Sequence, residues 1–180
     1  MKYIACYGDS LIQGFPYGNK YSWLVPCEEN KKLKMLNYGI CGEMTDDIFY
    51  RLRQYPLPDH VKHIIFLGGA NDIIFGCPYN YTLGMFDKLL AFCQQKNYKL
   101  CIVLPLISAE PVLNEKLERL KADLIEKFSG KALLLDLQPA IGLTQTERKK
   151  AYTDGVHPTA ETYKVMGELA RPILEAWVEE

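Results

Sequence analysis

Four short segments of the sequence carry groups that could do chemistry, and each comes after a different apolar run. Ser10, in the segment 8–11, supplies a hydroxyl, and Gly42 supplies a backbone N–H in the segment 39–45. Asn71 adds a side-chain amide donor, and Asp154 and His157 stand three residues apart in a loop that contains a glycine. Such a loop can fold the carboxylate onto the imidazole, which fixes the tautomer that a general base needs.

Each segment alone also has an ordinary structural interpretation. A serine such as Ser10 is a common helix N-cap, and Asn71 with the next aspartate is typical of a turn. The four segments together indicate a function more specifically than any one of them does. A nucleophile, oxyanion donors, a base and a residue that orients the base are the components of a serine hydrolase.

Five short apolar runs at wide spacing predict the elements that must position these residues. The runs lack the alternation of a half-buried strand, so they are typical of parallel strands buried on both faces. The runs are Tyr3–Tyr7, Lys34–Tyr38, His63–Leu67, Leu100–Leu104 and Ala132–Asp136.

Helical patterns lie between these runs. We expect one helix to begin after Thr45 as its N-cap, and the last to begin after Pro158 with Thr159 as its N-cap. Pro172 lies inside that last pattern and should kink or split the helix. Two further apolar stripes are Met85, Leu89, Phe92 and Cys93, and Leu113, Leu117, Leu120, Leu124 and Phe128.

Strands that alternate with helices predict a three-layer α/β/α sandwich around a parallel sheet. No repeat, linker or low-complexity tract divides the chain, so we expect one domain over residues 1–180. In open sheets of this class, the site forms outside the C-terminal ends of the strands. The four chemical segments occupy such positions.

The composition excludes several other classes of protein. Hydrophobic residues make up 48% of the chain, charged residues 24%, and the net charge is −1, which gives no general attraction to nucleic acid. No run of eighteen apolar residues predicts a membrane span, and the apolar start of the chain is too short for a signal peptide. We therefore interpret the six cysteines as reduced, buried thiols of a cytoplasmic protein. His60 and His63 have no third ligand nearby, so we expect a solvated loop rather than a metal site.

The four segments together resemble the sequence blocks of the GDSL lipase/esterase family, also called SGNH hydrolases. Cys41 is a departure, because the family usually has a small residue there. The resemblance implies a flavodoxin-like five-stranded parallel sheet of order 2-1-3-4-5. It also implies a Ser10 nucleophile, a His157 base oriented by Asp154, and an oxyanion hole made by Ser10, Gly42 and Asn71.

We therefore expect a serine carboxylester hydrolase that acts on small-molecule esters through an acyl-enzyme, without a metal or organic cofactor. Ile73 and Phe75, which follow the oxyanion asparagine, and Leu106, after the fourth run, are the candidate substrate-binding residues. Short-acyl esters, acetylated sugars, lysophospholipids and thioesters remain open. The alternatives are a non-catalytic flavodoxin-like ligand-binding module and an acyltransferase or carbohydrate deacetylase of the same family.

Overall fold

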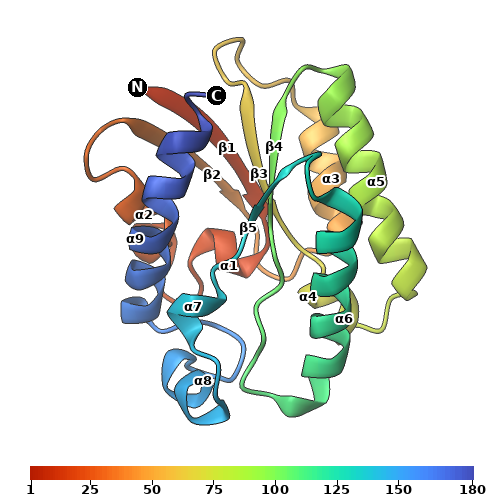
Figure 1. Cartoon of the computed structure of the whole chain (residues 1–180), viewed down its shortest axis with the longest axis vertical. Coiled ribbons are helices and arrows are strands. Elements are labelled where there is room, and N and C mark those ends of the chain that lie inside the picture. The colour runs from red at the N-terminus through yellow and green to blue at the C-terminus, as the bar shows by residue number, and fades with distance from the viewer.

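A computed structural model describes residues 1–180 of the protein, which fold around a single five-stranded sheet (Figure 1). All strand pairs are parallel and the strand order is β2-β1-β3-β4-β5, which confirms the predicted sheet. The boundaries of each predicted run differ from those of its strand by at most one residue. The strands are β1 (Lys2–Gly8), β2 (Leu33–Gly39), β3 (His63–Leu67), β4 (Lys99–Val103) and β5 (Leu133–Leu135).

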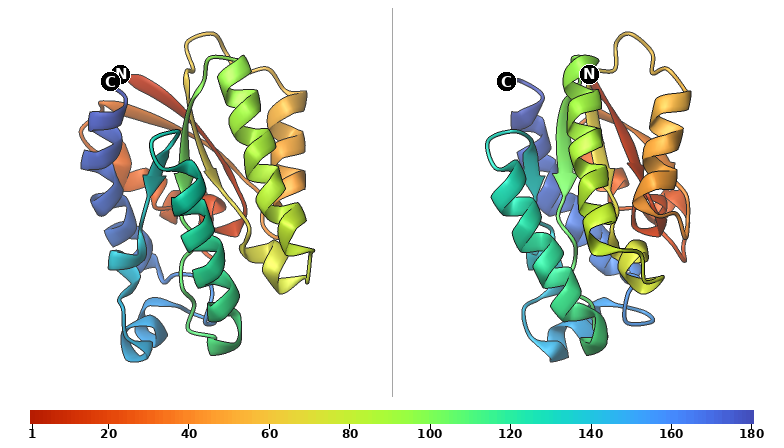
Figure 2. Two further views of the ribbon diagram at one scale, coloured as in Figure 1. Left: turned by 45° about the vertical axis from the view of Figure 1, so that its right-hand side comes forward. Right: turned by 90° about the vertical axis from the view of Figure 1, so that its right-hand side faces the viewer.

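Helices connect the strands and cover both faces of the sheet (Figure 2). The predicted helical patterns correspond to the four longest helices, whereas the shorter ones had no periodic signal. The helices are α1 (Ser10–Gln13), α2 (Leu24–Cys27), α3 (Thr45–Gln54), α4 (Ala70–Ile74), α5 (Tyr79–Gln95), α6 (Pro111–Phe128), α7 (Gln138–Ile141), α8 (Gln145–Ala151) and α9 (Ala160–Trp177), with one 3-10 helix, η1 (Asn19–Tyr21).

The sheet separates two hydrophobic cores. Successive residues of β1 point to opposite faces, so Ile4 and Cys6 belong to one core while Ala5 and Tyr7 belong to the other. The first core lies under α1, α2, α7 and α9, and the second lies under α3, α5 and α6. Because both faces are covered, the inner strands β1, β3 and β4 are mostly apolar, as the sequence predicted, whereas the edge strand β2 also contains Lys34 and Asn37.

Two details of the helices differ from the prediction. The N-cap of α3 is Met44 rather than Thr45, because the Thr45 side chain is bonded elsewhere. Pro172 does not split α9, which is one helix over Ala160–Trp177. Leu174 and Trp177, beyond the proline, are as buried as the residues before it. Their packing therefore outweighs the one backbone hydrogen bond that a proline removes.

The cysteine and histidine predictions need partial correction. Four cysteines are buried, but Cys41 is exposed and Cys77 is half-buried, since both lie in loops at the edge of the sheet. His63 is only 8% exposed, because β3 includes it and its ring packs edge-on against Trp177 at 4.8 Å between centroids. Burial, together with two nearby lysines, lowers the pKa of His63 below its usual value. The cytoplasmic location stays a prediction.

None of the helices combines the length and the apolar character needed to cross a lipid bilayer.

The close packing of α9 on α2 gives a test of the fold. A Cβ added at Gly167 would lie 2.2 Å from the carbonyl oxygen of Trp23, whereas one added at Gly84 in α5 would meet nothing within 4 Å. We predict that Gly167→Ala destabilises the protein by about 1–3 kcal/mol. Gly84→Ala should stabilise it by about 0.5–1 kcal/mol, because alanine is the better helix former. The melting temperatures of the two variants should therefore shift in opposite directions from that of the wild type. Equal shifts would contradict the close packing at Gly167.

Candidate active site

The turn between β1 and α1 presents the Ser10 hydroxyl at the C-terminal edge of the sheet. Asp9 caps α1, with Oδ1 accepting a hydrogen bond of 2.9 Å from the N–H of Leu11. The side chain of Ser10 is therefore not needed as a cap. Ser10 is the first residue of α1, so no carbonyl within the helix accepts a bond from its N–H. Residues 9 and 10 are both almost completely buried.

His157 links the serine to a carboxylate. Its Nε2 lies 3.0 Å from Ser10 Oγ, and its Nδ1 lies 2.7 Å from Asp154 Oδ2. The other oxygen of Asp154 accepts the backbone N–H groups of Val156, at 3.1 Å, and His157, at 2.8 Å. The structure thus brings together the three residues that the sequence placed in a hydroxyl–imidazole–carboxylate series.

The state of Asp154 fixes the tautomer of the imidazole. Partial burial by itself raises the pKa of this carboxyl, but the hydrogen bonds from His157 and Val156 outweigh it, so the net pKa is below the usual value. An ionised carboxylate only accepts hydrogen bonds, so Nδ1 of His157 carries the proton. Nε2 is then free to accept the hydroxyl proton of Ser10.

The loop that carries Asp154 and His157 is anchored to the loop after β4. The N–H of Ala109 donates to the Gly155 carbonyl at 2.8 Å. The buried hydroxyl of Tyr152 donates to the carbonyl of Ile107 at 3.0 Å. These bonds hold the imidazole although the Asp154 side chain is half exposed.

Gly42 lies in the loop before α3 and has an unbonded N–H. Its φ of +83° is in the left-handed region that favours glycine, and a Cβ there would meet nothing within 4 Å. The N–H of Gly42 makes no hydrogen bond within the protein. A glycine at this position therefore serves the backbone conformation and leaves a donor for a ligand.

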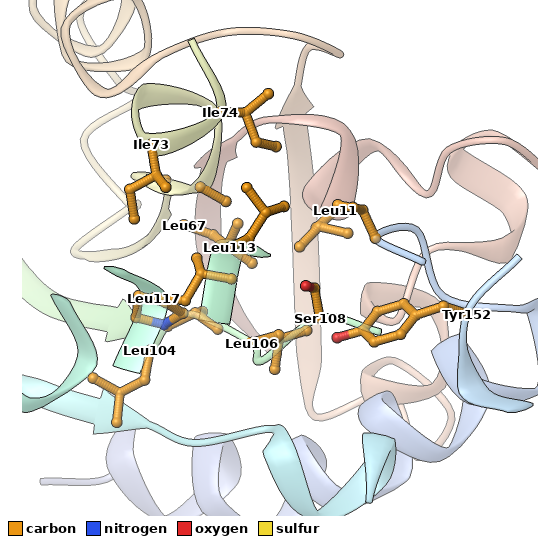
Figure 3. Close-up of a pocket in the computed structure, with 15 residues that line it drawn as sticks. Leu11, Leu67, Ile73, Ile74, Leu104, Leu106, Ser108, Leu113, Leu117 and Tyr152 are labelled. Carbon is orange, nitrogen blue, oxygen red and sulfur yellow. The ribbon is translucent and has the colours of Figure 1, made fainter. Parts of the chain in front are cut away.

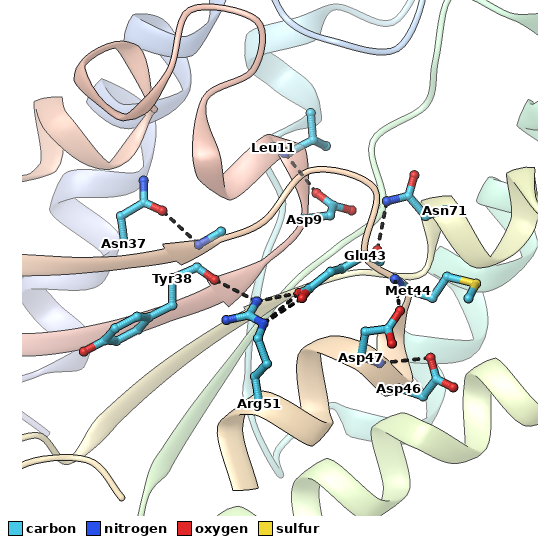
Figure 4. Close-up of polar contacts among 11 residues, drawn as sticks. Asp9, Leu11, Asn37, Tyr38, Glu43, Met44, Asp46, Asp47, Arg51 and Asn71 are labelled. Atoms are coloured by element: carbon cyan, nitrogen blue, oxygen red, sulfur yellow. Dashed lines mark hydrogen bonds and ion pairs between the residues drawn. The ribbon is translucent and has the colours of Figure 1, made fainter. Parts of the chain in front are cut away.

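Asn71 lies at the start of α4, and its side chain contacts the residue that follows Gly42. Its Nδ2 donates one hydrogen bond, of 2.9 Å, to the carbonyl of Glu43, as Figure 4 shows. An amide group has a second N–H, which these contacts leave available. Arg51 holds the same loop, with Nε 2.8 and 2.9 Å from the two carboxylate oxygens of Glu43 and Nη2 2.9 Å from the carbonyl of Tyr38.

Asp72 is a buried residue of the site region, although its local sequence is typical of a turn. One carboxylate oxygen accepts the N–H of Thr45 at 2.9 Å, and the other accepts the hydroxyls of Thr45 at 2.6 Å and Thr82 at 3.2 Å. Asp72 therefore joins the starts of α3, α4 and α5. Nothing in the local sequence signals these bonds, because their partners are distant in the chain.

Figure 3 shows an apolar cavity whose lining includes chain neighbours of Ser10, Asn71 and His157. Two of the three candidate substrate-binding residues, Ile73 and Leu106, line it, together with Leu11 and Val156. Phe75 does not line the cavity, and its side chain is 64% exposed. No group of three or more His, Cys, Asp or Glu side chains is arranged to hold a metal ion.

The fold and the site define a flavodoxin-like α/β protein with a Ser-His-Asp arrangement at the C-terminal edge of its sheet. The model of the GDSL-like lipase/acylhydrolase family matches residues 6–165. The chain therefore belongs to that family, as the resemblance of its sequence blocks indicated. The comparison with curated proteins finds no match.

Several solved structures share the fold of this chain. A G-D-S-L family protein from Desulfitobacterium hafniense DCB-2 has a TM-score of 0.86 at 18% identity, over 96% of this chain and 99% of that one. A member of the lipolytic protein G-D-S-L family from Veillonella parvula DSM 2008 has a TM-score of 0.84 at 19% identity, over 100% of both chains. A carbohydrate acetylesterase family member from Sinorhizobium meliloti has a TM-score of 0.77 at 17% identity, also over 100% of both.

The buried carboxyl of Asp9 generates a prediction about pH. Burial raises its pKa to about 7, the hydrogen bond from Leu11 opposes this, and the charge of Asp72 adds to it. Between pH 4 and 7 the folded state then holds a proton that the unfolded state has lost. The contribution of Asp9 to the free energy of unfolding is therefore fully present below about pH 4 and is lost as the pH rises to about 7.

Asp9→Asn keeps a cap acceptor but carries no ionisable group. We predict that the variant gains stability relative to the wild type as the pH rises from 4 to 7. The gain should be at most about 4 kcal/mol, at 1.36 kcal/mol per pKa unit, and should stay constant above pH 7. Denaturant unfolding of both proteins at several pH values measures it, and parallel pH curves would contradict it.

Proposed function

We propose that the protein is a serine esterase that hydrolyses carboxylic esters through an acyl-enzyme. The observation that supports this most directly is the pair of short contacts from Ser10 Oγ to His157 and from His157 to Asp154. Membership of an acylhydrolase family agrees with it. One solved structure of the same fold is described as a carbohydrate acetylesterase family member, which is also ester chemistry.

The first half of the reaction acylates the serine. As Ser10 Oγ attacks the ester carbonyl carbon, its proton passes to Nε2 of His157, and Asp154 stabilises the resulting imidazolium. The carbonyl oxygen becomes an oxyanion that the N–H groups of Ser10, Gly42 and the Asn71 side chain stabilise. The tetrahedral intermediate then collapses, the bond to the alkoxy oxygen breaks, and His157 returns the proton to the leaving alcohol.

The second half releases the acid. Water gives a proton to Nε2 of His157 as its oxygen attacks the acyl carbon. The same three donors stabilise the second oxyanion. When the bond to Ser10 Oγ breaks, the serine takes the proton back and the carboxylic acid leaves. An alcohol in place of water would make the enzyme an acyltransferase, and product analysis with added alcohols distinguishes the two.

Labelling of the serine tests the proposal. A fluorophosphonate reacts with a serine that a histidine activates, so we predict one adduct by intact mass, located at Ser10 by peptide mapping. Ser10→Ala should abolish the adduct. The matched control Ser129→Ala should label normally, because Ser129 lies at the end of α6 and bonds only to the carbonyl of Ile125. A wild type that does not label beside a reactive control esterase would favour the non-catalytic binding module.

Asn71 provides a second, kinetic prediction. An amide donor is worth more to an oxyanion than to a neutral ester, so its loss lowers kcat rather than KM. We predict that Asn71→Ala lowers kcat about 10²–10³-fold, roughly 3–4 kcal/mol, with KM within a few-fold.

Asn71 also holds the carbonyl of Glu43, so a control must separate donation from loop support. Arg51→Met removes the ion pair from the same loop but keeps the amide, and its loss of kcat should be much smaller. Melting temperatures of both variants identify any general destabilisation. An Arg51→Met loss as large as that of Asn71→Ala, or a normal kcat in Asn71→Ala, would contradict the oxyanion role.

A further inference from the structure

The apolar cavity lies directly beside the groups that the proposed reaction uses. Leu11, Ala70 and Val156 line it, and each is the chain neighbour of Ser10, Asn71 or His157. An acyl carbon bonded to Ser10 Oγ, with its oxygen toward Gly42 and Asn71, therefore has this cavity within reach of its hydrocarbon part.

The cavity has no free polar side chain to recognise a charged or hydroxylated acyl group. Ser108 and Tyr152 are the two lining side chains that carry hydroxyls. Ser108 Oγ lies 2.9 Å from Asn114 Oδ1 and 3.0 Å from the Glu110 carbonyl, and Tyr152 donates to a backbone carbonyl. Burying a further polar group here without a partner costs free energy, so the cavity favours plain hydrocarbon.

The volume of the cavity is small for an acyl chain. It is about 20 Å³, whereas an apolar cavity that admits benzene has about 150 Å³. Its inner wall is built from core residues that cannot withdraw without breaking their packing, namely Leu67, Val103, Leu104 and Leu117, all at most 5% exposed. On α6, Leu113 also lines the cavity but is only half-buried (Figure 3).

We propose that this cavity is the acyl subsite and that it restricts the enzyme to short acyl groups of about two or three carbons. Longer chains meet Leu117 on the inner side and Leu113 on the outer side. The inference rests on the proposed esterase function and adds the class of acyl group to it. It makes Leu113 a residue that determines acyl length.

A series of p-nitrophenyl esters tests this, because the leaving group stays constant while the acyl group grows. We expect kcat/KM, normalised to the uncatalysed rate, to fall at least 10-fold from acetate to hexanoate and further to octanoate, since one methylene can change specificity 10-fold or more. Leu113→Ala should raise the hexanoate-to-acetate ratio of kcat/KM at least 10-fold.

Leu117→Ala should have the same effect from the inner side, but it empties part of the core and can impair folding. Leu113→Ala does not carry this risk, because Leu113 is only half-buried. The matched control is Leu90→Ala, a half-buried leucine of α5 that does not line the cavity, and its chain-length profile should equal that of the wild type.

The experiment distinguishes a failure of the acyl-length inference from a failure of the proposed esterase function. If Ser10 labels and esters are hydrolysed, but octanoate is turned over as well as acetate or Leu113→Ala leaves the profile unchanged, the acyl-length inference is overturned and the esterase function stands. If no ester is hydrolysed and no serine labels, the esterase function falls and the inference falls with it.

Discussion

The contact between Ser10 Oγ and His157 Nε2 joins residues 147 positions apart in the chain, and the site depends on it. This contact is possible because β1 lies inside the sheet and α9 packs on the same face of the sheet as α1, which brings the C-terminal part of the chain back to Ser10. The hydroxyl of Tyr163, in α9, donates to the carbonyl of Phe15 at 2.9 Å, and the Phe15 ring packs edge-on against the imidazole at 4.6 Å between centroids. The burial of α9 therefore sets the position of His157 relative to Ser10.

Much of this arrangement was predictable from the sequence because it depends on local signals. Continuous apolar runs indicate buried parallel strands, and residues placed after such strands converge at one edge of the sheet. That rule applies to Ser10, Gly42 and Asn71. The strand order came from the resemblance of the sequence blocks to a known family, since apolar runs alone do not say which strands are neighbours. The roles of the site residues remain predictions.

Other features were not predictable because their cause lies far away in the chain. Asp72 resembles a turn residue, but its carboxylate accepts hydrogen bonds from residues 27 and 10 positions distant. The outward position of Phe75 depends on where the five-residue helix α4 ends, and four or five residues show no periodicity. His63 is buried because Trp177, from the other end of the chain, covers it.

The division of the interior into two cores has a consequence for the site. The elements that carry Ser10 and His157 pack in the core under α9, whereas those that carry Gly42 and Asn71 pack in the core under α3 and α5. The site thus combines residues from the two layers that pack on opposite faces of the sheet. A small sliding of one layer over the other would leave Ser10 and His157 in contact while moving Gly42 and Asn71 away from them. Under the proposed mechanism, activation of Ser10 and stabilisation of the oxyanion by Gly42 and Asn71 would therefore depend on different layers of the protein.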